Sequence, residues 1–161
     1  MEGDTKKLEG LGGWLILVGI KTVVTPFTML KQINLTYEEI NDADGAWEIL
    51  TTPGTEYYHP LWSPLLIGEI GINIVLAILS FYLIFLFFTK NKNFPKLLIG
   101  ILICSVLLQL IDGFAGKILM PNQPFFIDQE GLREFGTLVM SCLIWIPYML
   151  VSNRVKATFI R

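Results

Sequence analysis

Charged side chains are scarce in this sequence: lysine, arginine, aspartate and glutamate together make up 16% of its 161 residues. A typical soluble domain carries about a quarter. The formal net charge is only −2, and no basic cluster stands beside aromatic residues. Nucleic acid is therefore not expected as a partner, and so little charge over so much chain favours lipid as the solvent.

Residues that commonly carry chemistry are few as well. Histidine occurs once, as His59, and cysteine twice, as Cys104 and Cys142, which both lie within apolar runs. Without a Cys-x-x-Cys spacing they indicate neither a disulfide framework nor a metal site. The sequence also contains no HExxH, GxSxG or phosphate-binding loop. We therefore expect no enzyme, no catalytic residue, no metal ligand and no cofactor.

Apolar residues are abundant, at 53%, and gather into long runs that raise the mean hydropathy to +0.58. Lipid offers no partners to backbone N–H and C=O groups, so each segment that crosses it must be a helix of about 20 residues. Four runs are long enough, at residues 11–33, 61–89, 97–119 and 135–152. The sequence predicts a single all-α membrane domain over residues 1–161, a four-transmembrane-helix bundle that runs up-down-up-down.

Lysine and arginine fall mainly into the segments on alternate sides of these spans. They precede the first span, join the second to the third, and follow the fourth: Lys6, Lys7, Lys90, Lys92, Lys96, Arg154, Lys156 and Arg161. The loop at 34–60 has several acidic residues and neither lysine nor arginine. Because cytoplasmic loops are enriched in these two residues, we expect both termini and the 90–96 link to be cytoplasmic. Loops 34–60 and 120–134 would then lie outside.

The first outer loop is long for a compact domain. Thr36 followed by Glu39 matches a capping box, and Ile40, Trp47 and Leu50 could share one side of a short helix. Two interpretations remain open. The loop forms a short acidic helix over the outer mouth of the bundle, or it is solvated and irregular.

Distinctive short motifs lie at the two ends of the chain. Residues 10–15 read GLGGWL, and residues 145–156 read WIPYMLVSNRVK. In a four-span chain these motifs resemble the ends of the small YdgK-like bacterial inner-membrane proteins, a family of unknown function. The resemblance implies a bacterial inner membrane, and it supplies neither an activity nor functional residues.

Polar side chains recur at helical spacing within the spans. An ionisable group deep in a span costs several kcal/mol, on the order of 3, unless it is paired or hydrated, so each is a candidate for function. The candidate intramembrane polar site combines such groups with their polar neighbours: Lys21, Thr25, Glu69, Asn73, Gln109 and Asp112. Counting residues along the helices favours an ion pair between Lys21 and Asp112, since five residues, or about 7 Å, separate their depths.

Two interpretations of this polar seam remain open. It fixes the packing of a small bundle and binds nothing, or it forms an outward-facing cavity for a small solute, an ion or a lipid headgroup. The first favours a structural or accessory subunit that acts by contact with other membrane proteins. The second favours transport or binding, although four helices without an inverted repeat are few for alternating access. Expected partners are membrane lipids and another membrane protein or a second copy of this chain.

Overall fold

Every regular element of the described chain is a helix. The computed structural model describes residues 10–41, 46–121 and 129–160, and this part of the chain contains no strand. Four helices are long and apolar enough to cross a membrane: α2 (Trp14–Asn41), α4 (Trp62–Phe88), α5 (Phe94–Leu119) and α6 (Gln129–Val151). Two are short: α3 (Ala46–Thr51) and α7 (Asn153–Thr158). The prediction of an all-α protein with four membrane-length helices is confirmed.

The first long helix continues past the predicted span end at residue 33. Helix α2 runs to Asn41, so Thr36 lies inside it, and the interpretation of Thr36 as a helix cap is wrong. Beyond the apolar run, the side-chain amide of Asn34 donates to the Glu38 carboxylate at 2.7 Å, one turn further on. Such pairs allow a helix to continue into a polar environment. Of the three residues expected to share one side of a short helix, Ile40 belongs to α2, whereas Trp47 and Leu50 do lie in a short helix, α3, which packs against α2 and α4.

A tight turn joins α4 to α5 and fixes where both helices end. Lys90 adopts a left-handed conformation (φ 55°), and the Asn91 amide donates to the Leu86 carbonyl at 3.0 Å. The Asn91 side chain in turn accepts from the Asn93 amide at 2.9 Å. Pro95 occupies the first turn of α5, where a missing N–H removes no helical hydrogen bond. Helix α5 therefore begins at Phe94, three residues before the predicted span.

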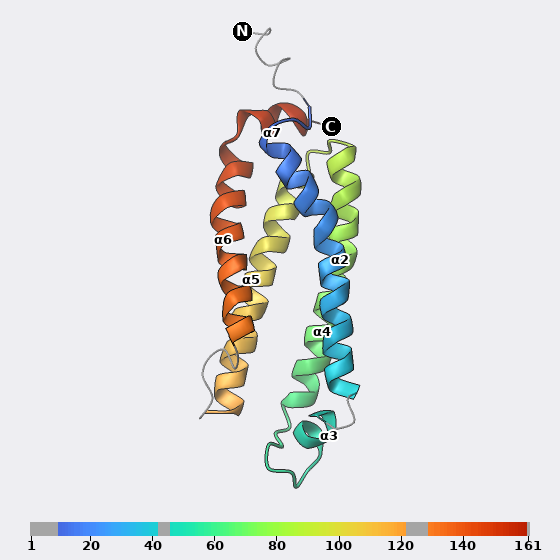
Figure 1. Ribbon diagram of the computed structural model, residues 1–161, viewed down its shortest axis with the longest axis vertical. Helices are drawn as coiled ribbons and strands as arrows, with labels where there is room; N and C mark the ends of the chain where they lie inside the picture. The colour runs from blue at the N-terminus through green and yellow to red at the C-terminus, as the bar shows by residue number, and fades with distance from the viewer. Residues whose placement is uncertain (1–9, 42–45, 122–128, 161) are drawn as a thin grey trace.

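The bundle consists of two helix pairs. Helix α2 packs along α4 and α5 packs along α6, while α4 and α5 join the pairs. Figure 1 shows these pairs meeting at the end where α7 lies and diverging toward the end where α3 lies. We call the first the closed end and the second the open end.

Aromatic residues from three elements form the core of the closed end. The rings of Phe94 and Phe159 stack with centroids 4.6 Å apart, and Phe87 lies 5.1 Å from Phe94. Leu15 and Phe94 are completely buried. Helix α7, which the sequence did not predict, is capped by Ser152, whose side chain accepts from the Val155 backbone amide at 3.4 Å. Because α7 lays its buried face on this core, it seals the end of the bundle.

The two terminal motifs meet at the closed end. The Thr158 hydroxyl lies 3.3 Å from both the amide and the carbonyl oxygen of Gly10. The Arg154 guanidinium covers Gly12 so closely that a Cβ there would lie 2.9 Å from it. Gly13 has φ +62°, a conformation that L residues with side chains rarely adopt. The glycines thus allow residues 10–13 to pack directly against α7.

Candidate functional site

A cavity of about 900 Å³ lies between the two helix pairs. All four long helices contribute to its lining. It brings together every residue of the candidate polar site: Lys21, Thr25, Glu69, Asn73, Gln109 and Asp112. Helical periodicity had placed each of these side chains on one face of its own helix, and the structure places those faces around a common space. A functional role for the six residues stays a prediction.

Toward the closed end, the lining is cationic and rich in hydroxyl groups. The Lys21 ammonium donates to the Ser141 hydroxyl at 2.7 Å, which links α2 to α6 across the cavity. The neighbouring Thr25 hydroxyl donates to the Lys21 carbonyl at 2.8 Å. Next to Ser141, the Cys142 thiol lies 3.7 Å from the Leu102 carbonyl oxygen. This contact puts the ammonium of Lys21 near the level of Leu102 on α5.

The predicted ion pair between Lys21 and Asp112 is wrong. No ion pair joins these two residues, both of which the structure describes, and Lys21 bonds to Ser141 instead. Helix α2 begins three residues later than predicted and α5 three residues earlier. Measured from those starts, the two residues are eleven positions apart in depth rather than five, or about 16 Å. Errors in the two helix boundaries therefore added instead of cancelling.

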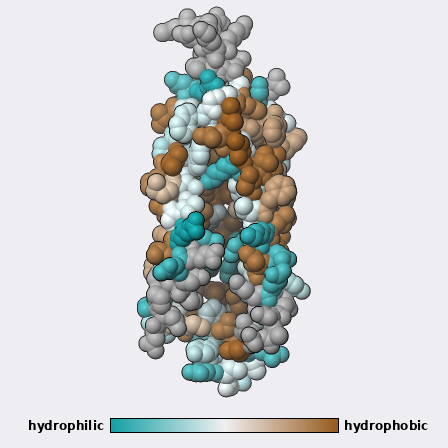
Figure 2. Space-filling model, in the orientation of Figure 1, coloured by the Kyte–Doolittle hydropathy of each residue, from teal (hydrophilic) through white to brown (hydrophobic). Residues whose placement is uncertain are grey.

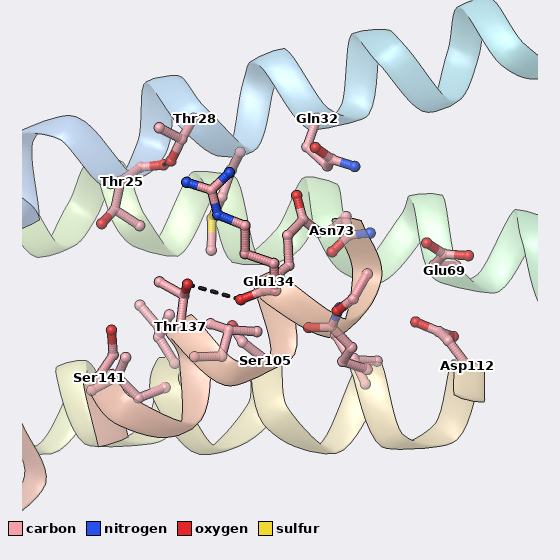
Figure 3. A pocket seen from close by; sticks show the side chains of 18 of the residues that line it. Thr25, Thr28, Gln32, Glu69, Asn73, Ser105, Asp112, Glu134, Thr137 and Ser141 are labelled. Atoms are coloured by element: carbon pink, nitrogen blue, oxygen red, sulfur yellow. Dashed lines mark hydrogen bonds between the residues drawn. The ribbon is translucent and has the colours of Figure 1, made fainter. Parts of the chain in front are cut away.

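Toward the open end, the lining is acidic. Figure 3 shows Glu69 on α4 and Asp112 on α5 pointing toward one another, with Asn73 beside them. Among the residues that the structure describes, none forms a hydrogen bond or ion pair with the Asp112 carboxylate. One turn nearer the closed end, the side-chain amide of Gln109 donates to the Gly131 carbonyl at 3.5 Å and connects α5 to the start of α6.

Helix α6 supplies lining residues that sequence reasoning missed. Arg133 and Glu134 line the cavity, although the sequence had placed both in the loop 120–134. Helix α6 begins at Gln129, inside that predicted loop, and so it carries them into the bundle. The Thr137 hydroxyl donates to the Arg133 carbonyl at 2.9 Å, the bond drawn in Figure 3. Thr137 and Ser141 lie four residues apart in the sequence, and the same spacing continued backward reaches Arg133, which was the available signal.

The cavity is open on one side of the bundle. Helices α4 and α5 pack together, whereas α2 and α6 make little contact apart from the bond between Lys21 and Ser141. Figure 2 shows hydrophilic residues gathered around a hollow between the two helix pairs. The opening therefore lies between α2 and α6, on the flank of the bundle rather than only at its open end.

The cavity offers hydrogen bonds and charge, and its carboxylates do not form a metal cage. Within the described ranges, no three histidine, cysteine, aspartate or glutamate side chains stand close enough together to hold a metal ion. Lys21 and Asp112 lie at opposite ends of the cavity along the bundle axis, with Arg133 and Glu134 between their levels. Such a lining suits a polar molecule that carries both signs of charge.

Four long apolar helices around a polar cavity define the class: the chain is a multi-pass membrane protein. More particularly, residues 8–160 match a family described as "Protein of unknown function (DUF2569)", and the chain belongs to that family. The match includes both terminal motifs, 10–15 and 145–156. No curated protein and no solved structure matches the chain. Because the family carries no assigned function, the chemistry of the cavity has to indicate one.

Proposed function

We propose that this protein binds or transports a small polar molecule through the cavity between its helix pairs. The observation that carries this proposal is the volume of about 900 Å³ that the polar lining leaves between the helices. Polar stripes that served packing alone would bond to one another across close helix contacts. Apart from the bond between Lys21 and Ser141, these stripes stand apart around a space of the size that ligand sites commonly have, about 300 to 1,000 Å³.

We also propose that the protein lies in the bacterial inner membrane with its closed end toward the cytoplasm. The described lysines and arginines of the predicted cytoplasmic segments all belong to the α4–α5 turn, the start of α5 or α7: Lys90, Lys92, Lys96, Arg154 and Lys156. This distribution supports the orientation, because such residues favour the cytoplasmic side. The resemblance of both terminal motifs to YdgK-like bacterial proteins supports the choice of membrane. The cavity would then face outward.

Retention of a native ligand tests the binding function. The full-length protein is purified from native membranes in mild detergent, and bound molecules are weighed by native mass spectrometry. The double variant Lys21→Met and Arg133→Met removes both cations that line the cavity, whereas Lys92→Met removes an exposed one from the α4–α5 turn. We expect a bound molecule on the wild type and on Lys92→Met, with at least tenfold lower occupancy on the double variant. Equal occupancy on all three proteins, or none on the wild type, would contradict the proposal.

An accessory role by contact with another membrane protein is the second candidate. Helix α6 supports it, since the candidate span Gly131–Val151 is the least buried of the four, at 6% of its most apolar window. A photo-crosslinking residue at Leu143, which is 65% exposed on α6, reports a partner. The matched control is Ile78 on α4, which is 62% exposed. We expect Leu143 to crosslink to one defined protein or to a second copy, and a chain crosslinked only to lipid at both positions would exclude this role.

A further inference from the structure

The position of the opening restricts what the ligand of the cavity can be. A water-soluble solute needs access only from the open end, yet the hollow also opens along the flank between α2 and α6. With four membrane-length helices standing across the bilayer, that flank faces lipid. A molecule that enters there keeps its polar part in the cavity and its apolar part outside. The opening therefore suits an amphiphile.

The borders of the opening suit such a molecule. Thr28 on α2 and Thr137 on α6 both line the cavity and are exposed, and each hydroxyl is satisfied by a carbonyl of its own helix. Val24 and Met140, one turn away from these threonines, are about half exposed to the surroundings. A polar headgroup can thus pass between hydroxyl groups while its chains stay against apolar side chains.

The order of charges along the cavity indicates the kind of headgroup. Going from the closed to the open end, the ammonium of Lys21 comes first and the carboxylates of Glu69 and Asp112 come last. Arg133 and its neighbour Glu134 lie between them, because Gly131 is level with Gln109 and these two residues are two and three positions nearer the closed end. A ligand that matches this order carries its negative charge deeper and its positive charge nearer the open end.

We infer that the ligand is an aminophospholipid of the outer leaflet, bound by its phosphate and its primary ammonium group. The inference rests on the proposed binding function and deepens it. In such a lipid the phosphate is nearer the chains and the ammonium is the outermost group, which reproduces the observed order of charges. The phosphate accepts from Arg133, with Lys21 deeper in the cavity, and the ammonium donates to Asp112 across from Glu69.

The spacing of the charged residues agrees with this assignment. The backbone positions of Arg133 and Asp112 lie on opposite sides of the Gln109–Gly131 level, two and three residues away, or about 7 Å apart along the axis before the reach of their side chains is added. A two-carbon link between phosphate and ammonium, with a hydrogen bond of about 3 Å at each end, spans that separation. A quaternary ammonium cannot donate a hydrogen bond to Asp112, and an anionic glycerol headgroup brings no cation to it.

Native mass spectrometry with defined lipids tests the inference. The delipidated full-length protein is offered phosphatidylethanolamine, phosphatidylglycerol or phosphatidylcholine in mixed micelles, and soluble glycerophosphoethanolamine in a separate arm. We expect phosphatidylethanolamine to reach at least tenfold higher occupancy than the other three. Asp112→Asn should remove most of that preference over phosphatidylglycerol, whereas Glu56→Gln, a neutralised carboxylate in an exposed loop, should keep it.

The possible failures are distinguishable. Equal binding of soluble glycerophosphoethanolamine, or preferred binding of phosphatidylglycerol, would overturn the aminophospholipid inference and leave the proposed binding function in place. A phosphatidylethanolamine preference that Asp112→Asn leaves unchanged would overturn it too, since the lipid would then be bound elsewhere. A native ligand whose occupancy the double variant Lys21→Met and Arg133→Met leaves unchanged contradicts the proposed function itself. Circular dichroism of each variant confirms that its helices remain folded.

Discussion

The closed and open ends of the bundle hold the same helices together by different means. At the closed end, Leu15, Phe94 and Phe159 are at most 6% exposed and pack ring against ring or against apolar side chains. At the open end, Glu69 and Asp112 stand across a cavity between helix pairs that have diverged. In lipid, helices associate through close packing and hydrogen bonds rather than through exclusion of water. The comparison indicates that the close packing lies at one end and the proposed binding site at the other.

The largest stability effect should come from the aromatic core. Phe94→Ala leaves a cavity at a completely buried position between Phe87 and Phe159, and we expect a loss of about 3 kcal/mol. Thermal unfolding in detergent, followed by circular dichroism, measures it. Phe88→Ala is the matched control, because Phe88 is 60% exposed to lipid. Equal losses in the two variants would show that the closed end is not the stability centre.

Close packing of α2 against α4 gives the next effect. A Cβ added to Gly19 would lie 2.9 Å from the ring of Phe87, which is itself buried and cannot move aside. We expect Gly19→Ala to cost about 2 kcal/mol by overpacking. Gly100→Ala meets no atom within 4 Å and should be neutral or slightly stabilising. If both alanines stabilise the protein in the same unfolding assay, the two helices are not in tight contact there.

The contact between the chain ends should contribute less. Thr158→Val keeps the shape of the side chain but removes its hydrogen bonds to Gly10, so we expect a loss of about 1 kcal/mol. Limited proteolysis should cut the N-terminal segment faster in this variant. Thr89→Val provides the control, because the exposed Thr89 hydroxyl bonds only within its own helix. Unchanged proteolysis in Thr158→Val would mean that this contact does not hold the segment.

The smallest effect is expected in the cavity. Ser141→Ala removes the hydrogen bond from Lys21, and interhelical bonds of this kind average about 0.6 kcal/mol in membranes. The double variant with Lys21→Met isolates the coupling between the two side chains by a thermodynamic cycle. A coupling above about 2 kcal/mol would contradict the separation of stability from binding and return the polar seam to a structural role.

Much of the architecture follows from the sequence because lipid restricts it. Apolar runs such as 61–89 can satisfy their backbone in the bilayer only as helices, and α4 ends within one residue of that prediction. Helix α7 was missed because it is not a long apolar run, so this restriction does not apply to it. It is a single short helix. Its Val155, and Phe159 directly after it, become informative only once the aromatic core that they cover is known.

The candidate site shows where sequence reasoning stops. A spacing of three or four residues placed Lys21, Glu69 and Asp112 on polar faces, and those faces do surround one cavity. Depth is a different quantity, since each misplaced helix boundary shifts a side chain by about 1.5 Å per residue. Such shifts separated Lys21 from Asp112 and hid Arg133 in a predicted loop. Residue periodicity thus predicted which helix faces are polar. Which side chains contact one another across the cavity could be known only from where the helices begin and end in the structure.

The bond between Gly10 and Thr158 has a consequence for biogenesis. It joins residues 148 positions apart, and a chain is synthesised and inserted from its N-terminus. Gly10 therefore cannot bond to Thr158 until α6 and α7 have been made. Until that moment Leu15 and Phe94 lack the covering face of Phe159. Closure of this end of the bundle is thus the last step of its assembly, and it takes place only after all four spans have been inserted.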